Sequence, residues 1–132
     1  MKKLLIILFL SICSTYSFAQ LTEGKYKILS VKGFVDGKTA YDNFFEENVA
    51  IVRVTPKLIN IVIGGYSVLT YTINEHIVME ENNVYNVMEL QSGNTSTLLF
   101  QRMKEYPQID GGMLIIKRSE NYADIFSVLK EE

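Results

Sequence analysis

The sequence predicts an all-β protein, an antiparallel up-and-down meander of about eight or nine strands that closes into a barrel. Gly, Asn and Asp recur at short, regular spacing and separate runs rich in Val, Ile, Thr, Tyr and Phe. In several runs apolar and polar residues alternate, as they do in strands with one buried face. A flat sheet of so many short strands would leave two free edges, and closure into a barrel removes them.

The first residues have the pattern of a secretory signal peptide. Lys2 and Lys3 precede a short apolar run, and Ala19 ends a stretch with small residues where signal peptidase needs them. We expect residues 1–19 to be removed by cleavage between Ala19 and Gln20. Residues 20–132 are then expected to form a single barrel domain that is exported to the periplasm or outside the cell.

Two features of this leader bear on membrane attachment. Its apolar run of about ten residues is shorter than the roughly 20 that a transmembrane helix needs, so no membrane span is expected after cleavage. Cys13 lies in the outline of a lipoprotein cleavage site, but the bulky Ile12 before it and the competing site at Ala19 argue against a lipid anchor.

Each short run is assigned to a strand in turn. Ile59, Ile61 and Ile63 share one face of their strand, which illustrates the alternation. Residues 39–47 fit either a short helix or a loop over one end of the barrel. Residues 122–130 fit a helix or a further strand, and their β-branched and aromatic content favours the strand. Besides residues 122–130, the expected strands lie near 25–35, 49–55, 57–63, 66–73, 76–80, 84–91, 95–103 and 112–118.

The titratable residues do not form a recognisable catalytic or metal-binding pattern. His76 is the only histidine, and the only cysteine lies in the leader. A zinc site of the usual His and Cys ligands therefore has too few ligands, and no nucleophile elbow accompanies His76. Adjacent glutamates on one strand point to opposite faces and do not converge on one substrate. We expect no enzyme activity, no metal and no cofactor.

Aromatic residues are the candidates for binding. Tyr66, Tyr71, Tyr85 and Phe100 lie in expected strands, and a small barrel either fills its interior with side chains or holds one small ligand. If these rings face inward around a cavity, they line a ligand site. If the interior is filled, they are ordinary core residues, and the sequence leaves both interpretations open.

Two short motifs resemble the start of bacterial lipocalin-like domains. Gly24-Lys25-Tyr26 opens the first expected strand, and Asp36-Gly37-Lys38 follows it as a turn. In the family the aromatic residue is tryptophan, which Tyr26 replaces here, and a late strand ends in a pair such as Gln101-Arg102. The resemblance implies a ligand-carrying barrel in which a basic residue, Arg102 or Arg118, packs over the ring of Tyr26.

The charge balance limits the classes of partner. The chain has 13 basic and 15 acidic residues, and removal of Lys2 and Lys3 makes the mature chain still more acidic. Nucleic acid is therefore not expected as a partner. We expect an exported, non-catalytic protein that binds a small, partly apolar ligand inside the barrel. The alternative is a secreted module that binds a protein partner, as inhibitors and immunity proteins do, with no internal ligand.

Overall fold

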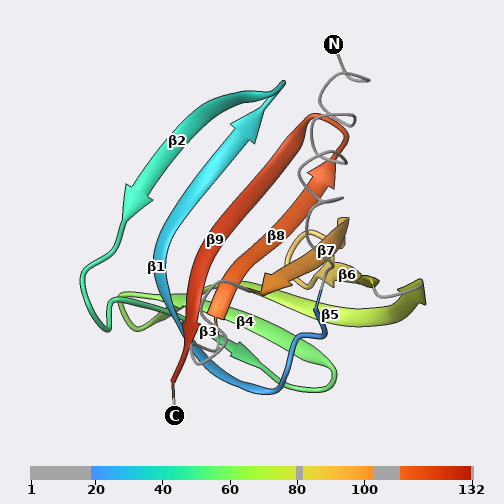
Figure 1. The fold of residues 1–132 in the computed structure, drawn as a ribbon, viewed down its shortest axis with the longest axis horizontal. Coiled ribbons are helices and arrows are strands. Elements are labelled where there is room, and N and C mark those ends of the chain that lie inside the picture. The colour runs from blue at the N-terminus through green and yellow to red at the C-terminus, as the bar shows by residue number, and fades with distance from the viewer. Residues whose placement is uncertain (1–18, 80–81, 103–110, 132) are drawn as a thin grey trace.

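In a computed structural model of the chain, residues 19–79, 82–102 and 111–131 are described. They contain nine strands and no helix. Figure 1 shows their arrangement. The strands are β1 (Gly24–Val35), β2 (Lys38–Phe44), β3 (Ala50–Val54), β4 (Leu58–Ile63), β5 (Tyr66–Met79), β6 (Asn82–Glu89), β7 (Thr95–Arg102), β8 (Gly111–Ser119) and β9 (Tyr122–Lys130).

The strands form one antiparallel sheet that closes on itself. The order is β2-β1-β3-β4-β5-β6-β7-β8-β9, and a further pairing between β1 and β9 completes the ring. Eight strands make the closed barrel and β2 is an extra strand. The all-β meander barrel predicted from the sequence is therefore confirmed, and so is a strand at residues 122–130.

Strand β1 is long enough to pair with β9 along nearly its whole length and with two strands on its other side. Gly24–Lys27 pair with β3, and Ser30–Val35 pair with β2. Figure 1 shows β2, β1, β9 and β8 rising together above the rest of the barrel. We call the end where the β1–β2 and β8–β9 turns lie the hairpin end. The backbone N–H of Asp36 donates to the carbonyl of Asn121 there and joins the two turns.

Two local expectations need correction. Residues 39–44, expected as a helix or loop, belong to strand β2, and only 45–49 form a connection. Alternation did not reveal β2 because both of its faces are largely exposed. The turn expected at Asn74-Glu75 is instead a bulge inside β5, where the pairing with β6 shifts between Ile73 and Glu75.

Alternating side chains from the barrel strands fill the interior. The largest fully buried side chains include Tyr26, Tyr71 and Phe100, surrounded by Ile, Leu and Val residues. Tyr26 packs edge-on against Phe100, with 6.2 Å between ring centroids. The segment 19–23 closes the end opposite the hairpin end, where the Ala19 N–H donates to the carbonyl of Phe100.

Candidate polar site at the hairpin end of the barrel

A buried carboxylate marks the hairpin end. Asp124 on β9 lies opposite Gly33 on β1, and Gly33 lies opposite Tyr41 on β2. Residues directly opposite one another project from the same face of a sheet, so Tyr41 and Asp124 both face the interior. The Tyr41 hydroxyl donates a hydrogen bond to Asp124 Oδ1.

Gly33 makes this contact possible. A Cβ at this position would overlap the ring of Tyr41. Because glycine has no side chain, the tyrosine ring lies directly across the β1 backbone and reaches β9. The glycine therefore provides the space through which an edge strand contacts a strand two positions away in the sheet.

Arg118 holds the second oxygen of the same carboxylate. Its Nε lies 3.2 Å from Asp124 Oδ2, and the side chains are 41% and 3% exposed respectively. The Arg118 guanidinium also lies 5.2 Å from the centre of the Tyr122 ring. A buried carboxylate is costly unless it is paired and hydrogen-bonded. Asp124 meets this requirement with one partner on each oxygen.

Tyr71 brings an unpaired hydroxyl into the same region. The residue lies on β5 opposite Glu89 on β6, and its hydroxyl is buried with no hydrogen-bond partner of normal geometry. The Arg118 guanidinium is close enough to act on this hydroxyl electrostatically, as are Glu89 and Asp124. Most buried polar groups have a partner, so an orphaned one calls for an explanation such as a missing water or ligand.

These surroundings shift the pKa values of the cluster. Burial raises the pKa of the Tyr41 hydroxyl far above its ordinary value, and the hydrogen bond to Asp124 and the charge of that carboxylate raise it further. Burial also raises the pKa of Tyr71, although the charge of Arg118 opposes this. For Arg118, burial lowers the pKa, but the carboxylate of Asp124 and other neighbours outweigh it, so the pKa is raised. The residues Tyr41, Tyr71, Glu89, Arg118 and Asp124 are called the mouth cluster below.

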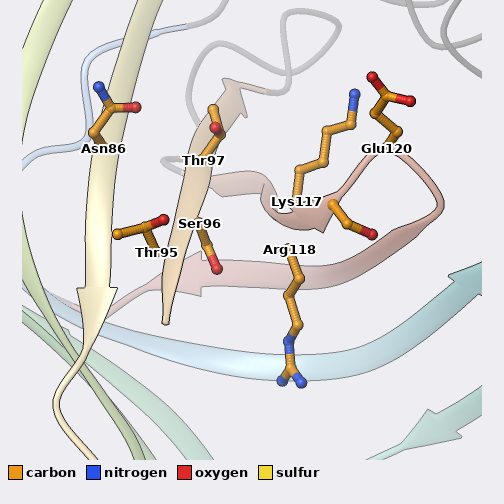
Figure 2. Close-up of a pocket in the computed structure, with 8 residues that line it drawn as sticks. Asn86, Thr95, Ser96, Thr97, Lys117, Arg118 and Glu120 are labelled. Carbon is orange, nitrogen blue, oxygen red and sulfur yellow. The ribbon is translucent and has the colours of Figure 1, made fainter. Parts of the chain in front are cut away.

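A polar groove of about 560 Å³ adjoins the mouth cluster. Figure 2 shows Lys117 and Arg118 extending in opposite directions from β8, so Arg118 belongs to both the groove and the cluster. Side chains of β6, β7 and the β8–β9 turn supply hydroxyl, amide and carboxylate groups. The groove is lined by Asn86, Thr95, Ser96, Thr97, Lys117, Arg118, Ser119 and Glu120.

A second pocket, of about 440 Å³, lies at the opposite end of the barrel. The rings of His76 and Tyr85 stack there, with centroids 4.3 Å apart and an interplanar angle of 11°. The Tyr85 hydroxyl accepts a hydrogen bond from the N–H of Leu21 at 3.0 Å, and burial raises the pKa of Tyr85. Residues 20–23 form one wall of this pocket.

The four aromatic residues predicted to bind a ligand divide between the two ends. Tyr71 belongs to the mouth cluster, and Tyr66 lies opposite Ile63 at the start of β5 with its side chain 80% exposed. Tyr85 lies at the opposite end, and Phe100 is fully buried beside Tyr26. The structure therefore does not bring the four rings together in one site.

Of the residues of the family motif, Gly24, Tyr26 and Arg102 lie at the end opposite the hairpin end, and Arg118 does not. Lys130 Nζ lies 5.9 Å from the centre of the Tyr26 ring and 2.9 Å from Thr22 Oγ1. The Arg102 guanidinium lies 6.0 Å from the centre of the Phe100 ring, at the same end of the barrel. Arg118, the other arginine expected over Tyr26, lies at the hairpin end. Gly24 has φ 142°, and Lys130 Cε lies 3.0 Å from the place a Cβ would occupy.

The sequence analysis did not identify Tyr41, Glu89 or Asp124 as site residues. A signal for Asp124 was present. Tyr122, Asp124, Phe126 and Val128 share one face of the expected strand, and an acidic residue on an otherwise apolar face indicates a buried, paired carboxylate. No comparable signal marked Tyr41, since its segment was expected to be a helix or a loop.

Searches for other types of site were negative within the described ranges. No group of three or more His, Cys, Asp or Glu side chains among these residues is placed to hold a metal ion. No helix in this part of the chain is long and apolar enough to cross a membrane. The expected leader, including Cys13, lies outside the described residues except for Ala19.

Comparisons with protein-family models, curated proteins and solved structures found no match to this chain.

Proposed function

We propose that the protein binds a small, partly apolar molecule at the hairpin end of the barrel and carries out no chemistry on it. The observation that carries the proposal is the buried hydroxyl of Tyr71, whose proton has no acceptor, beside the Arg118–Asp124 ion pair. Ligand sites typically combine apolar walls with a few placed polar groups whose pKa values are perturbed. The mouth cluster supplies such polar groups.

Apolar side chains next to the cluster supply the walls. Phe45, Ile63 and Leu69 are partly buried and pack against the core. Tyr66 lies beside Ile63 on the same face of the β4–β5 hairpin and is mostly exposed. Strand β2 is the edge of the sheet and pairs only with β1 in the described topology.

Arg118 lies next to Tyr71 and is much more exposed than its partner Asp124. A shift of its guanidinium toward solvent would weaken the ion pair with Asp124, and ligand contacts would have to offset that cost. Movement of its guanidinium would leave Asp124 hydrogen-bonded to Tyr41. A ligand atom then has access to the Tyr71 hydroxyl without unfolding any strand.

Export is part of the same proposal. The leader pattern that ends at Ala19 supports a site of action in the periplasm or outside the cell. The resemblance of the Gly24-Lys25-Tyr26 motif to bacterial lipocalin-like domains also supports a carrier that acts there.

Binding of an uncharged fluorescent ketone, 6-propionyl-2-(dimethylamino)naphthalene, tests the proposal. We expect a blue-shifted, saturable signal with purified residues 20–132. Tyr71→Phe should weaken binding about fivefold, the cost of one hydrogen bond of roughly 1 kcal/mol. Tyr85→Phe makes the same chemical change at the other end and should leave the affinity unchanged.

Two results would contradict this site. One is the absence of saturable binding. The other is a reversed pattern, in which Tyr85→Phe weakens binding and Tyr71→Phe does not. Native mass spectrometry of gently purified protein gives an independent check, because a co-purifying ligand adds a defined mass that the Tyr71→Phe protein should retain less well.

A second candidate function is binding to a protein partner. It is favoured by the exposure of two aromatic side chains, Phe44 (82%) and Tyr66 (80%), which is unusual on an inert surface. Affinity capture from the native cell envelope tests it, with Phe44→Ser as the matched variant. Capture of one partner that is lost with Phe44→Ser, together with an absence of ligand binding, would favour this function over the first.

A further inference from the structure

The charges around the Tyr71 hydroxyl determine which polar group of a ligand can bind beside it. Glu89 lies directly opposite Tyr71 on the neighbouring strand. Asp124 and Arg118 are the other charged groups that act on this hydroxyl. Two carboxylates and one guanidinium therefore act on the Tyr71 hydroxyl, whose proton has no acceptor.

The positive charge of Arg118 is already paired with the carboxylate of Asp124. Arg118 Nε lies 3.2 Å from Asp124 Oδ2, and both oxygens of Asp124 have partners. A ligand carboxylate placed beside Tyr71 would compete with Asp124 for Arg118 and would lie near Glu89 as well. Like charges in a partly desolvated site destabilise one another strongly, so the site disfavours an anionic head group.

The available hydrogen-bonding groups also disfavour a cation. Arginine offers only donors, and the Tyr71 hydroxyl has a proton with no acceptor. An ammonium group has no acceptor for the Tyr71 proton or for Arg118, and Arg118 repels it. Asp124 already has a partner on each oxygen, so only Glu89 is left to attract the cation. An uncharged carbonyl oxygen accepts hydrogen bonds from both groups and adds no net charge.

From this arrangement we infer that the ligand presents an uncharged carbonyl, as in an amide, ester or ketone, to Tyr71 and Arg118. The inference rests on the proposed function and adds the chemical class of the ligand's polar end. It predicts discrimination between molecules with the same apolar chain and different head groups.

A displacement experiment at neutral pH tests the inference. Decanamide (uncharged), decanoate (negative) and decylamine (positive) have the same chain length, and each is used to displace the fluorescent ketone. We expect decanamide to displace the probe at a concentration about tenfold or more below those of the two charged compounds. Equal potency of the three, or tighter binding of either charged compound, would overturn the inference while leaving ligand binding intact. Failure of the ketone itself to bind would refute the proposed function and the inference together.

Two matched charge variants locate the cause of the discrimination. Glu89→Gln removes one of the two carboxylates near Tyr71, and we expect it to improve decanoate binding several-fold relative to decanamide. Glu120→Gln makes the same change in the polar groove and should leave that ratio unchanged. Folding of each variant is verified from its thermal unfolding midpoint. An unchanged ratio in a folded Glu89→Gln protein, or an equal change in Glu120→Gln, would contradict the assignment.

Discussion

Tyr41 reaches Asp124 across the backbone of Gly33, so a single hydrogen bond joins strand β2 to strand β9 over the intervening strand β1. The contact attaches an edge strand whose own faces are largely exposed. It also gives one oxygen of a buried carboxylate its partner. The mouth cluster and the position of β2 therefore depend on the same glycine.

Replacement of Gly33 with alanine should destabilise the protein by about 1–3 kcal/mol, because the added methyl group overlaps the ring of Tyr41. Equilibrium urea unfolding measures this cost. In a Tyr41→Ala background the overlap is absent, so the cost of Gly33→Ala should largely disappear. The same cost in both backgrounds would show that another contact is responsible.

Loss of Arg118 should be more harmful than loss of the charge it neutralises. Arg118→Leu leaves Asp124 buried with only Tyr41 as a partner, and we expect a cost of about 1–3 kcal/mol, reduced from that of a fully buried pair because Arg118 is partly exposed. In the double variant Arg118→Leu, Asp124→Asn no uncompensated charge remains. Urea unfolding should show that the double variant is more stable than Arg118→Leu alone, and the reverse order would contradict the role assigned to the ion pair.

Alkaline pH should destabilise the protein through its buried tyrosines. The pKa of Tyr41 is raised above its ordinary value of 10.0 by burial, by its hydrogen bond to Asp124 and by the charge of that carboxylate. Below about pH 10 the hydroxyl is protonated in both the folded and the unfolded chain, so its full contribution to stability is present. Above that pH the unfolded chain releases the proton first, and the free energy of unfolding falls.

Unfolding midpoints at pH 8 and near pH 11 check this expectation. The difference between the two should be smaller for Tyr41→Phe than for the unsubstituted protein, because phenylalanine has no proton to lose. The matched control is Tyr66→Phe, which removes an exposed hydroxyl and should not alter the difference. Identical alkaline losses for the unsubstituted protein and Tyr41→Phe would exclude Tyr41 as a contributor.

Leu21 should anchor the segment that closes the end of the barrel opposite the mouth cluster. Its side chain is buried in the core and its N–H donates to the Tyr85 hydroxyl. Leu21→Ala should therefore cost about 1–3 kcal/mol in urea unfolding, less than a central core truncation because the segment is short. Gln20→Ala changes the exposed neighbouring residue and should be neutral. A negligible effect of Leu21→Ala would show that residues 19–23 do not contribute to the core.

The sequence predicted the elements whose strands have one buried and one exposed face. Alternation located β4 from Ile59, Ile61 and Ile63, whereas β-branched and aromatic content favoured the strand at Tyr122–Lys130. Alternation failed at β2, where both faces are largely exposed, and at Asn74, where an inserted bulge residue resembles a turn. Apolar and polar residues alternate in a strand only when one face is regularly buried, and these two segments lack such regular burial.

The candidate site was harder to predict because it depends on contacts between distant residues. Tyr41 and Asp124 are 83 positions apart, and they meet only because Gly33 leaves space between them. The chemical types of Tyr71 and Tyr85 pointed to binding roles for both, but the strand register places them at opposite ends of the barrel. Register between distant strands is set by the closed sheet and cannot be read from the spacing of residues in one strand.

The pairing of the first strand with the last has a consequence for how the molecule forms. Tyr26 lies opposite Lys130, so the ring of backbone hydrogen bonds closes only when two strands that are far apart in the sequence meet. Contacts of such long sequence separation form slowly. Loss of β9 would cost far more than its share of the length, because β8 and β1 would each be left with a bare edge.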